Sequence, residues 1–317
     1  MNKNVVITDY GFPDLKQEKA MLGAVGYDIV AGQCKTEDEV LGLSRNAEAL
    51  MVQWAPVTRK VIEGLENCRI IVRYGIGVDN VDLAAAKEKG IPVCNVPDYC
   101  IQEVADHAVA LALALGRQLL ITDRRVRSGT WKITPPNAMP AFREMTFATV
   151  GYGRIAREVL KRAAAFGFHT ATHDPFLKEE EIRKDNTHPM SLTQLFEQAD
   201  ILSLHSPLNK ATHHLINKNS LGMMKQNALL INTSRGGLID ADALAEAISK
   251  GKIAGAGLDV FEQEPLPAEH PLRKCENVIL TSHTAWYSES SIPELQLKAT
   301  EEVIRGLTGK PLTSRIA

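Results

Sequence analysis

Short apolar runs alternate with helix-forming segments along most of the chain, and this pattern limits the possible folds more than any other feature. The apolar runs stand at residues 4–10, 27–33, 49–54, 69–75, 91–97, 146–150, 169–174, 201–206, 228–234, 255–261 and 277–283. Strands that alternate with helices form parallel sheets with helices on both faces. The sequence therefore predicts an α/β protein built from two doubly wound parallel sheets.

The chain has 317 residues, which suggests about two domains. We expect one domain from 1–99, completed by 288–317, which includes a last helix near 293–307. We expect a second domain from 100–287. An apolar helix is predicted at about 102–120, with a polar connecting loop after it. The crossings at 100 and 287 predict two domains that close over a cleft.

Composition excludes several classes of protein. The net charge of −2 offers no field that would attract nucleic acid or an anionic membrane. The apolar stretch near 109–115 is far shorter than the roughly 18 residues of a membrane span. We therefore expect a cytoplasmic protein. No metal site is expected, because the five cysteines are scattered and the His213-His214 pair has no cysteine or carboxylate at a useful spacing.

A glycine pattern, Val-Gly-Tyr-Gly-Arg-Ile-Ala at 150–156, directly follows an apolar run and opens a predicted helix. Gly151 permits a tight turn, and Gly153 lets the backbone approach a pyrophosphate at the helix amino end. Asp174 ends the next predicted strand, 21 residues beyond Gly153. An acid there binds the ribose hydroxyls and repels a 2′-phosphate, which favours NAD (NADH) over NADP. The alternative is that Asp174 only starts a turn.

Polar residues stand where several of the expected strands end, and ligands of doubly wound sheets bind beyond these carboxyl ends. The residues are Ser206, Pro207, Thr233, Ser234, Arg235, Asp259, Glu264 and His283.

Three of these residues form a coherent catalytic set. The planar guanidinium of Arg235 suits a carboxylate. His283 can exchange a proton near neutral pH, and Glu264 can orient its ring. With NADH they would reduce a 2-keto acid, with hydride going to carbon and a proton from His283 going to oxygen. Singly, Arg235 could form a surface ion pair, Glu264 could start a loop, and His283 could cap a strand.

The segments VGYGRIA, INTSRGGLID, AGLDVFEQEP and SHTAWYSESS resemble the D-isomer-specific 2-hydroxyacid dehydrogenase family. This family includes phosphoglycerate dehydrogenases, glyoxylate/hydroxypyruvate reductases and the C-terminal-binding proteins. The resemblance extends to RYGIGVDNVD and GIPVCNVP in the first domain, while HTAWYSE and LNKATHHLIN are most similar to the C-terminal-binding-protein branch. We therefore expect 1–99 with 288–317 to be a flavodoxin-like substrate-binding domain and 100–287 to be a Rossmann NAD-binding domain. The resemblance also implies a homodimer joined through the NAD-binding domain, by a helix such as 102–120.

The resemblance also implies residue roles. It makes Arg235, Glu264 and His283 the catalytic set. It assigns the substrate carboxylate to the amides of a turn and cofactor contacts to a second group. The turn contains Gly75, Ile76 and Gly77, with Arg73 and Tyr74 beside them. The cofactor group contains Arg154, Ile155, Asp174, Pro207, Thr212, Thr233 and Asp259. A plain β-turn remains the alternative for residues 73–77.

The sequence departs from the family pattern at three positions near the substrate. Tyr74 and Ile76 replace smaller residues, and Trp286 would place an indole against the pocket. These changes suit an apolar substrate tail better than the phosphate of 3-phosphoglycerate, which stays an alternative substrate. A second class of function is an NADH-sensing dimeric scaffold like the corepressors of the C-terminal-binding-protein branch. The intact Arg, Glu and His set favours an enzyme.

Overall fold

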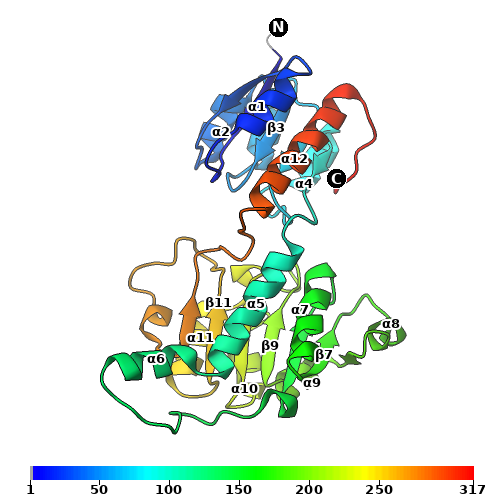
Figure 1. Ribbon diagram of the computed structural model, residues 1–317. Helices are drawn as coiled ribbons and strands as arrows, with labels where there is room; N and C mark the ends of the chain where they lie inside the picture. Colours follow the sequence, from blue (N-terminus) through cyan, green and yellow to red (C-terminus); the bar gives the residue numbers. More distant parts are fainter. Residues whose placement is uncertain (1–2) are drawn as a thin grey trace. The chain divides into compact units, whose positions relative to one another are not determined.

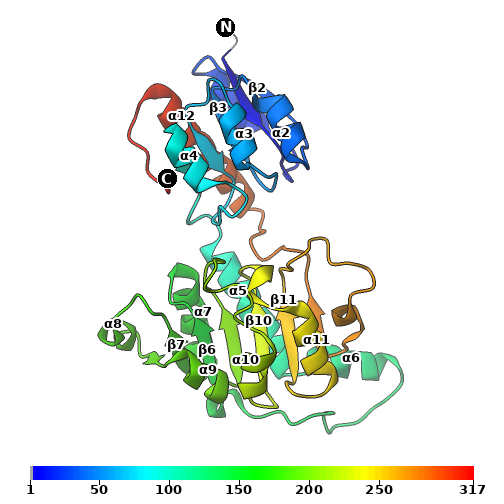
Figure 2. The same ribbon diagram turned by 180° about the vertical axis from the view of Figure 1, so that it is seen from behind.

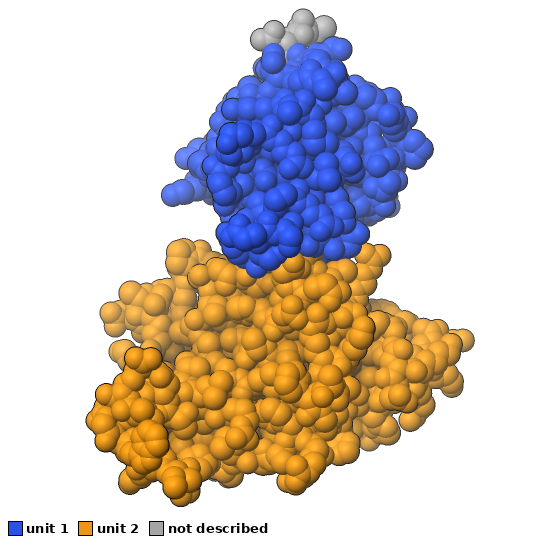
Figure 3. Space-filling model, viewed as in Figure 1, with its two compact units in different colours: residues 1–99, 287–317 blue, residues 100–286 orange. Residues whose placement is uncertain are grey.

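The protein consists of two compact units, as the computed structural model shows for residues 3–317 (Figure 3). Unit 1 contains the chain up to Tyr99 together with Tyr287–Ala317. Unit 2 is the continuous segment Cys100–Trp286. Each unit is built around its own parallel sheet, and these two sheets match the predicted α/β fold.

Unit 1 has a five-stranded parallel sheet in the order β2-β1-β3-β4-β5. Helices α1 and α12 cover one face in Figure 1, and α2, α3 and α4 cover the other face in Figure 2. The strands are β1 Asn4–Ile7, β2 Asp28–Ala31, β3 Ala49–Val52, β4 Ile71–Arg73 and β5 Val93–Cys94. The helices are α1 Lys16–Gly23, α2 Glu37–Ser44, α3 Arg59–Gly64, α4 Leu83–Lys89 and α12 Ser291–Thr308.

The last helix belongs to the core of unit 1. Leu295 and Val303 of α12 are fully buried. Gln296 donates its side-chain amide to the buried carboxylate of Glu18 in α1, at 2.9 Å. The segment after α12 then reaches β5, where the amide of Val93 donates to the carbonyl of Ala317. The two ends of the chain therefore complete one unit together.

Unit 2 has a seven-stranded parallel sheet in the order β12-β11-β10-β9-β6-β7-β8. Helices α5 and α7 lie on one face (Figure 1), and α9, α10 and α11 lie on the other (Figure 2). The strands are β6 Thr146–Val150, β7 His169–His173, β8 His188–Pro189, β9 Ile201–Leu204, β10 Leu229–Asn232, β11 Gly255–Leu258 and β12 Val278–Leu280. The helices are α5 Ile101–Gly116, α6 Leu119–Arg127, α7 Arg154–Ala165, α8 Glu179–Arg183, α9 Leu192–Gln198, α10 Lys218–Met223 and α11 Ala241–Ser249.

The register of this sheet brings the strand ends to one edge. Val150 at the end of β6 pairs with Leu204 of β9, and Leu204 pairs with Asn232 of β10. Asn232 pairs in turn with Leu258 of β11. The chain leaves β6 toward β7 on one side and returns to β9 on the other. This switch in direction is where doubly wound sheets bind nucleotides.

The expected helix at 102–120 is wrong in its extent. Helix α5 ends at Gly116, and a second helix begins at Leu119 after Gln118, whose φ is 53°. A side chain at Gly116 would lie 3.0 Å from the Phe142 ring, so the end of α5 packs closely against that ring. Helix α6 also includes residues expected in a loop. Its basic last turn is favourable at a helix carboxyl end.

Among residues 3–317, no single helix is long and apolar enough to cross a membrane. Helices α5 and α6 reach that length and apolarity only when taken as a pair, and they are bent by 56°.

Candidate active site

His283 and Glu264 form a hydrogen-bonded pair beyond the carboxyl ends of β12 and β11. The distance from His283 Nδ1 to Glu264 Oε2 is 2.8 Å. The backbone amide of His283 donates to the carbonyl of Asp259, and the Trp286 indole donates to the His283 carbonyl, both at 2.8 Å. With Nδ1 facing the carboxylate, Nε2 is the ring nitrogen that can exchange a proton with a ligand.

The environment of Glu264 keeps its carboxylate ionised. Burial opposes ionisation, but the hydrogen bond and charge of His283 outweigh it, so the pKa of Glu264 lies below its ordinary value. The amide of Phe261 supports this direction by donating to Glu264 Oε1 at 2.9 Å. An ionised carboxylate at Nδ1 fixes the ring orientation and stabilises a protonated imidazole.

Asp259 organises the turn that carries His283. Its side chain is fully buried just after β11. The carboxylate accepts hydrogen bonds from the amides of Thr284 and Ala285 at 2.9 Å and from the Thr281 hydroxyl at 2.5 Å. The structure thus gives Asp259 a positioning role. Its expected contact with the cofactor remains a prediction.

Arg235 follows β10, next to the segment that leads to Glu264. Its guanidinium donates to the Ser234 carbonyl at 2.7 Å, and its own carbonyl accepts from the Asn232 side chain at 2.8 Å. A Cβ atom at Gly236 would lie 1.9 Å from the carbonyl carbon of Phe261. The Arg235 turn is therefore packed directly against the backbone before Glu264, and a glycine is required there.

The glycine loop after β6 leaves the amino end of α7 accessible. Gly151 has φ 95°, and a Cβ there would lie 2.6 Å from the His205 carbonyl oxygen. Gly153 caps α7, and a Cβ there would meet no described atom within 4 Å. Arg154 is exposed in the first turn, and Ile155 is half-buried. The amino end of α7 therefore has open space at Gly153, as a bound pyrophosphate requires.

Two hydroxyls on neighbouring strand ends lack partners. Ser206 Oγ follows β9, and Thr233 Oγ1 follows β10. Within residues 3–317, neither buried atom has a hydrogen-bond partner. Buried polar groups normally have one, so this edge has unused hydrogen-bonding capacity for a ligand. Pro207 and Thr212 lie in the loop that follows Ser206, where the Thr212 hydroxyl donates to the Pro207 carbonyl at 2.6 Å.

Asp174 connects the glycine loop to the turn after β7. Its carboxylate accepts from the amide of Tyr152 at 2.9 Å and from the amide of Phe176 at 3.0 Å. Asp174 is therefore a turn residue, and it also stands beside the glycine loop, where a ribose would lie.

In unit 1, the structure corrects the expectation for Tyr74. Its side chain is 1% exposed, its hydroxyl donates to Glu18 at 3.0 Å, and its ring packs edge-on against Phe12. Its amide donates to Val52. Tyr74 is thus a core residue that cannot line a substrate site, because Phe12 packs against its ring and Glu18 of α1 accepts from its hydroxyl.

The rest of this turn offers two amides. The amide of Gly75 donates to the Arg73 carbonyl, and a glycine is favoured at this position because its φ is 137°, which residues with a Cβ rarely adopt. The amides of Ile76 and Gly77 have no acceptor within the described part of the chain. In this turn, the amides of Ile76 and Gly77 are therefore the two groups that could donate to an anion.

Comparison with known proteins identifies the family. Residues 109–285 match the family described as D-isomer specific 2-hydroxyacid dehydrogenase, NAD binding domain. This match covers more than half of the chain. The chain belongs to this family.

Individual relatives agree with this assignment. A glyoxylate reductase of Korarchaeum cryptofilum is 39% identical over 252 residues, which are 78% of this chain and 76% of that protein. A D-3-phosphoglycerate dehydrogenase of Methanocaldococcus jannaschii is 37% identical over 277 residues, 87% of this chain but only 52% of that protein. The crystal structure of an Aquifex aeolicus D-lactate dehydrogenase with NAD and lactic acid has a TM-score of 0.87 at 28% identity, covering 96% of both chains.

The dehydrogenase is therefore an NAD-dependent oxidoreductase, and its glycine loop and unpartnered hydroxyls fit that cofactor. The corepressor-like scaffold is not favoured, because the family match and these relatives are dehydrogenases and reductases.

Sequence reasoning missed His205, whose backbone packs against the glycine loop of the dehydrogenase. Its ring Nε2 is 2.8 Å from the Ser203 hydroxyl, and burial lowers the pKa of His205 from 6.5 to about 4. A histidine directly after a buried strand was visible in the sequence, but its burial was not.

This low pKa predicts acid sensitivity. Between pH 6.5 and about 4 the unfolded chain binds a proton at His205 that the folded dehydrogenase does not bind. The free energy of unfolding should therefore fall as pH decreases through this window, by at most about 3 kcal/mol, with no contribution above it. Urea unfolding of wild type and His205→Gln at several pH values measures this. An identical pH dependence in both proteins would show that His205 is not responsible.

Proposed function

We propose that the dehydrogenase transfers hydride from NADH to the carbonyl carbon of a small 2-keto acid while His283 Nε2 donates a proton to the oxygen. Glu264 orients the ring and stabilises its protonated form. Arg235 binds the carboxylate or carbonyl of the substrate. The observation that carries this proposal is the 2.8 Å pair of His283 and Glu264 at the nucleotide-binding edge of unit 2. Oxidation of the D-2-hydroxy acid uses the same groups in reverse.

In unit 1, the amides of Ile76 and Gly77 are proposed to bind the substrate carboxylate. Ile76 adds an aliphatic side chain to this turn. In unit 2, the Trp286 indole N–H donates to the His283 carbonyl, so any contact of this ring with a substrate is proposed to be apolar. These two residues support a small or apolar tail, whereas Tyr74, being buried, no longer contributes to that argument.

The preferred substrates are therefore unphosphorylated 2-keto and 2-hydroxy acids such as glyoxylate and lactate, which the names of two similar proteins also suggest. 3-Phosphoglycerate is the alternative substrate, supported by the name of the Methanocaldococcus jannaschii relative, a D-3-phosphoglycerate dehydrogenase.

The test is steady-state oxidation of NADH with glyoxylate, hydroxypyruvate, pyruvate, phenylpyruvate, a thioether keto acid and phosphohydroxypyruvate. We expect the highest kcat/KM with an unphosphorylated acid. A clear preference for phosphohydroxypyruvate would support the alternative substrate. Tight NADH binding without turnover of any acid would overturn the enzymatic proposal and support the scaffold.

The charge on Asp174 is proposed to set the choice of cofactor. Asp174→Asn keeps an acceptor oxygen for only one of the two amides, that of Tyr152 or that of Phe176, and removes the charge that repels a 2′-phosphate. We expect kcat/KM for NADH to fall and that for NADPH to rise, so that their ratio changes about tenfold or more, equivalent to roughly 1.4 kcal/mol. Kinetics with both cofactors measure it. An unchanged ratio would contradict a ribose-binding role.

The homodimer is also a proposal, supported by apolar side chains on and after α6. Trp131 is 83% exposed and Ile133 is 97% exposed, with Leu119 and Val126 also exposed. Such residues mark surfaces that bind other proteins. Sedimentation of wild type and a Trp131→Ser, Ile133→Ser variant tests the proposal. Monomeric wild type would refute it.

A further inference from the structure

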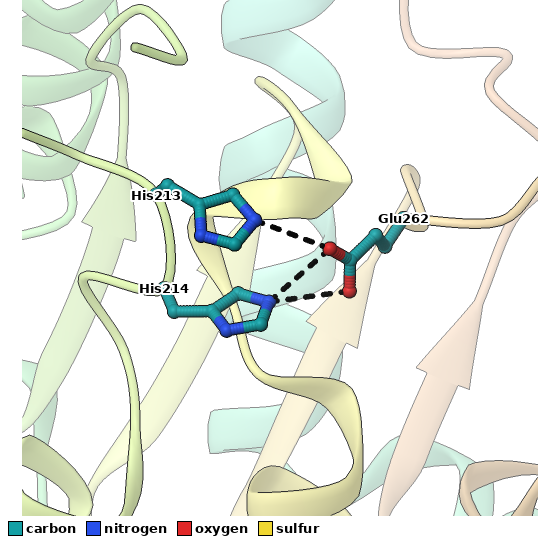
Figure 4. A group of neighbouring side chains, drawn as sticks. All are labelled: His213, His214 and Glu262. Atoms are coloured by element: carbon teal, nitrogen blue, oxygen red, sulfur yellow. Dashed lines mark hydrogen bonds and ion pairs between the residues drawn. The ribbon is translucent and has the colours of Figure 1, made fainter. Parts of the chain in front are cut away.

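Three metal-ligand side chains gather beside the catalytic edge of unit 2, outside the groups used in the proposed reaction. They are His213, His214 and Glu262 (Figure 4). His213 Nε2 lies 3.3 Å from Glu262 Oε1, and His214 Nε2 lies 3.2 Å from both carboxylate oxygens. One donor atom from each residue lies within 4.8 Å of the others. Figure 4 shows both rings pointing toward the same carboxylate.

The backbone holds the two histidines in this arrangement. The amide of His213 donates to the Asn209 carbonyl, and the amide of His214 donates to the Gly237 carbonyl, both at 2.8 Å. The two rings are stacked, with centroids 3.9 Å apart and planes inclined by 23°. His214 has φ 49°, a left-handed conformation uncommon outside glycine. Glu262 comes from the separate segment after β11, so only the fold brings its carboxylate to the histidine pair.

The donor set indicates which ions would bind. Two imidazoles with one carboxylate suit zinc and similar transition metals, whereas magnesium and calcium prefer oxygen ligands only. A tetrahedral ion with bonds of about 2.0–2.1 Å holds its ligand atoms about 3.3 Å apart. The measured N–O separations of 3.2 and 3.3 Å match this spacing. All three side chains are partly exposed, at 51%, 35% and 49%, so solvent can reach the ion and complete its coordination.

We propose that His213, His214 and Glu262 form a binding site for a zinc-class divalent ion. The ion would connect the loop after β9 to the segment after β11 through ligands from both. That segment includes Glu264, two residues beyond Glu262, and packs against Gly236. A bound ion would thus link the loop after β9 to the segment after β11, on either side of the Arg235 turn. This inference does not depend on the proposed reaction, because none of its ligands has a role there.

The experiment uses the whole chain, freed of metal with a chelator and desalted. Calorimetric titration with Zn²⁺ should show one ion per chain, and Co²⁺ should give the intense visible absorption of a tetrahedral complex. Loss of an outer-shell partner costs about 10–100-fold in metal affinity. His213→Ala, His214→Ala and Glu262→Gln each remove a direct ligand, so each should weaken Zn²⁺ binding by at least about tenfold. Excess Mg²⁺ should not compete.

His188→Ala is the matched control. His188 is an exposed histidine of the same unit, in β8 at the far end of the sheet order from β11 and β12, and its loss should leave Zn²⁺ binding unchanged. Far-UV circular dichroism and melting of the metal-free variants check that each one is folded. The proposal is overturned if wild type binds no Zn²⁺. It is also overturned if the folded His213→Ala, His214→Ala double variant binds like wild type, or if Co²⁺ shows only weak octahedral absorption.

Discussion

Replacing His283 by Asn should lower kcat for keto-acid reduction by about 100- to 10,000-fold, the range expected for loss of a general acid. Asparagine can still accept or donate near Glu264, but it cannot release a proton to the developing alkoxide. NADH affinity should change little, because the glycine loop and the end of β7 are separate from the turn at 281–285. Steady-state kinetics measure the first effect, and fluorescence titration with NADH measures the second.

Glu264→Gln is the informative companion to this variant. It keeps one acceptor oxygen, which can face either His283 Nδ1 or the Phe261 amide but not both, and it removes the charge that stabilises protonated imidazole. We expect a loss of activity smaller than that of His283→Asn. Because the two residues act as a unit, the double variant should be little worse than His283→Asn alone. Unchanged turnover in His283→Asn would remove His283 as the proton donor.

Gly236→Ala should damage both activity and stability, although it adds only one methyl group. The new Cβ would lie 1.9 Å from the Phe261 carbonyl carbon and 2.2 Å from the Glu262 nitrogen. Both are backbone atoms, so the Arg235 turn and the segment before Glu264 must separate. A displacement of about 1 Å in a catalytic site can cost about 100-fold in rate. Overpacking of this kind costs about 1–3 kcal/mol or more of unfolding free energy.

Kinetics and thermal melting test this prediction, with Gly222→Ala as the control. Gly222 lies inside α10 of the same unit, and a Cβ there would meet no described atom within 4 Å. Alanine in a helix interior is favoured over glycine by up to about 1 kcal/mol. The control should therefore be as stable as wild type or slightly more stable. If Gly236→Ala behaves like the control, the close packing of the two segments is wrong.

The sequence predicted the layout of unit 2 because strand periodicity and glycine spacing are local properties. Thr146–Val150 is a strand with the predicted limits. Glu264 and His283 could be expected at one edge because parallel strands place their carboxyl ends together. A short loop after β11 is then enough to bring Glu264 to His283.

Features that depend on distant packing could not be predicted. Tyr74 was predicted to lie near the substrate because nothing in the local sequence indicates that Phe12 packs on its ring and Glu18 binds its hydroxyl. The end of α5 at Gly116 packs against Phe142, which comes later in the chain. Glu262 stands 48 residues after His214 in the sequence, so only the fold shows that they meet. In each case the missing information was the identity of a neighbour from another segment.

The construction of unit 1 from both ends of the chain has a consequence for biosynthesis. A ribosome releases β1 to β5 first. The face of their sheet that α1 and α12 share stays partly uncovered until Ser291–Thr308 emerges. The continuous unit 2 is released in the meantime and can fold first. We therefore expect that nascent chains stalled before α12 contain a protease-resistant second unit and a protease-sensitive first one, the reverse of the order in which they are translated.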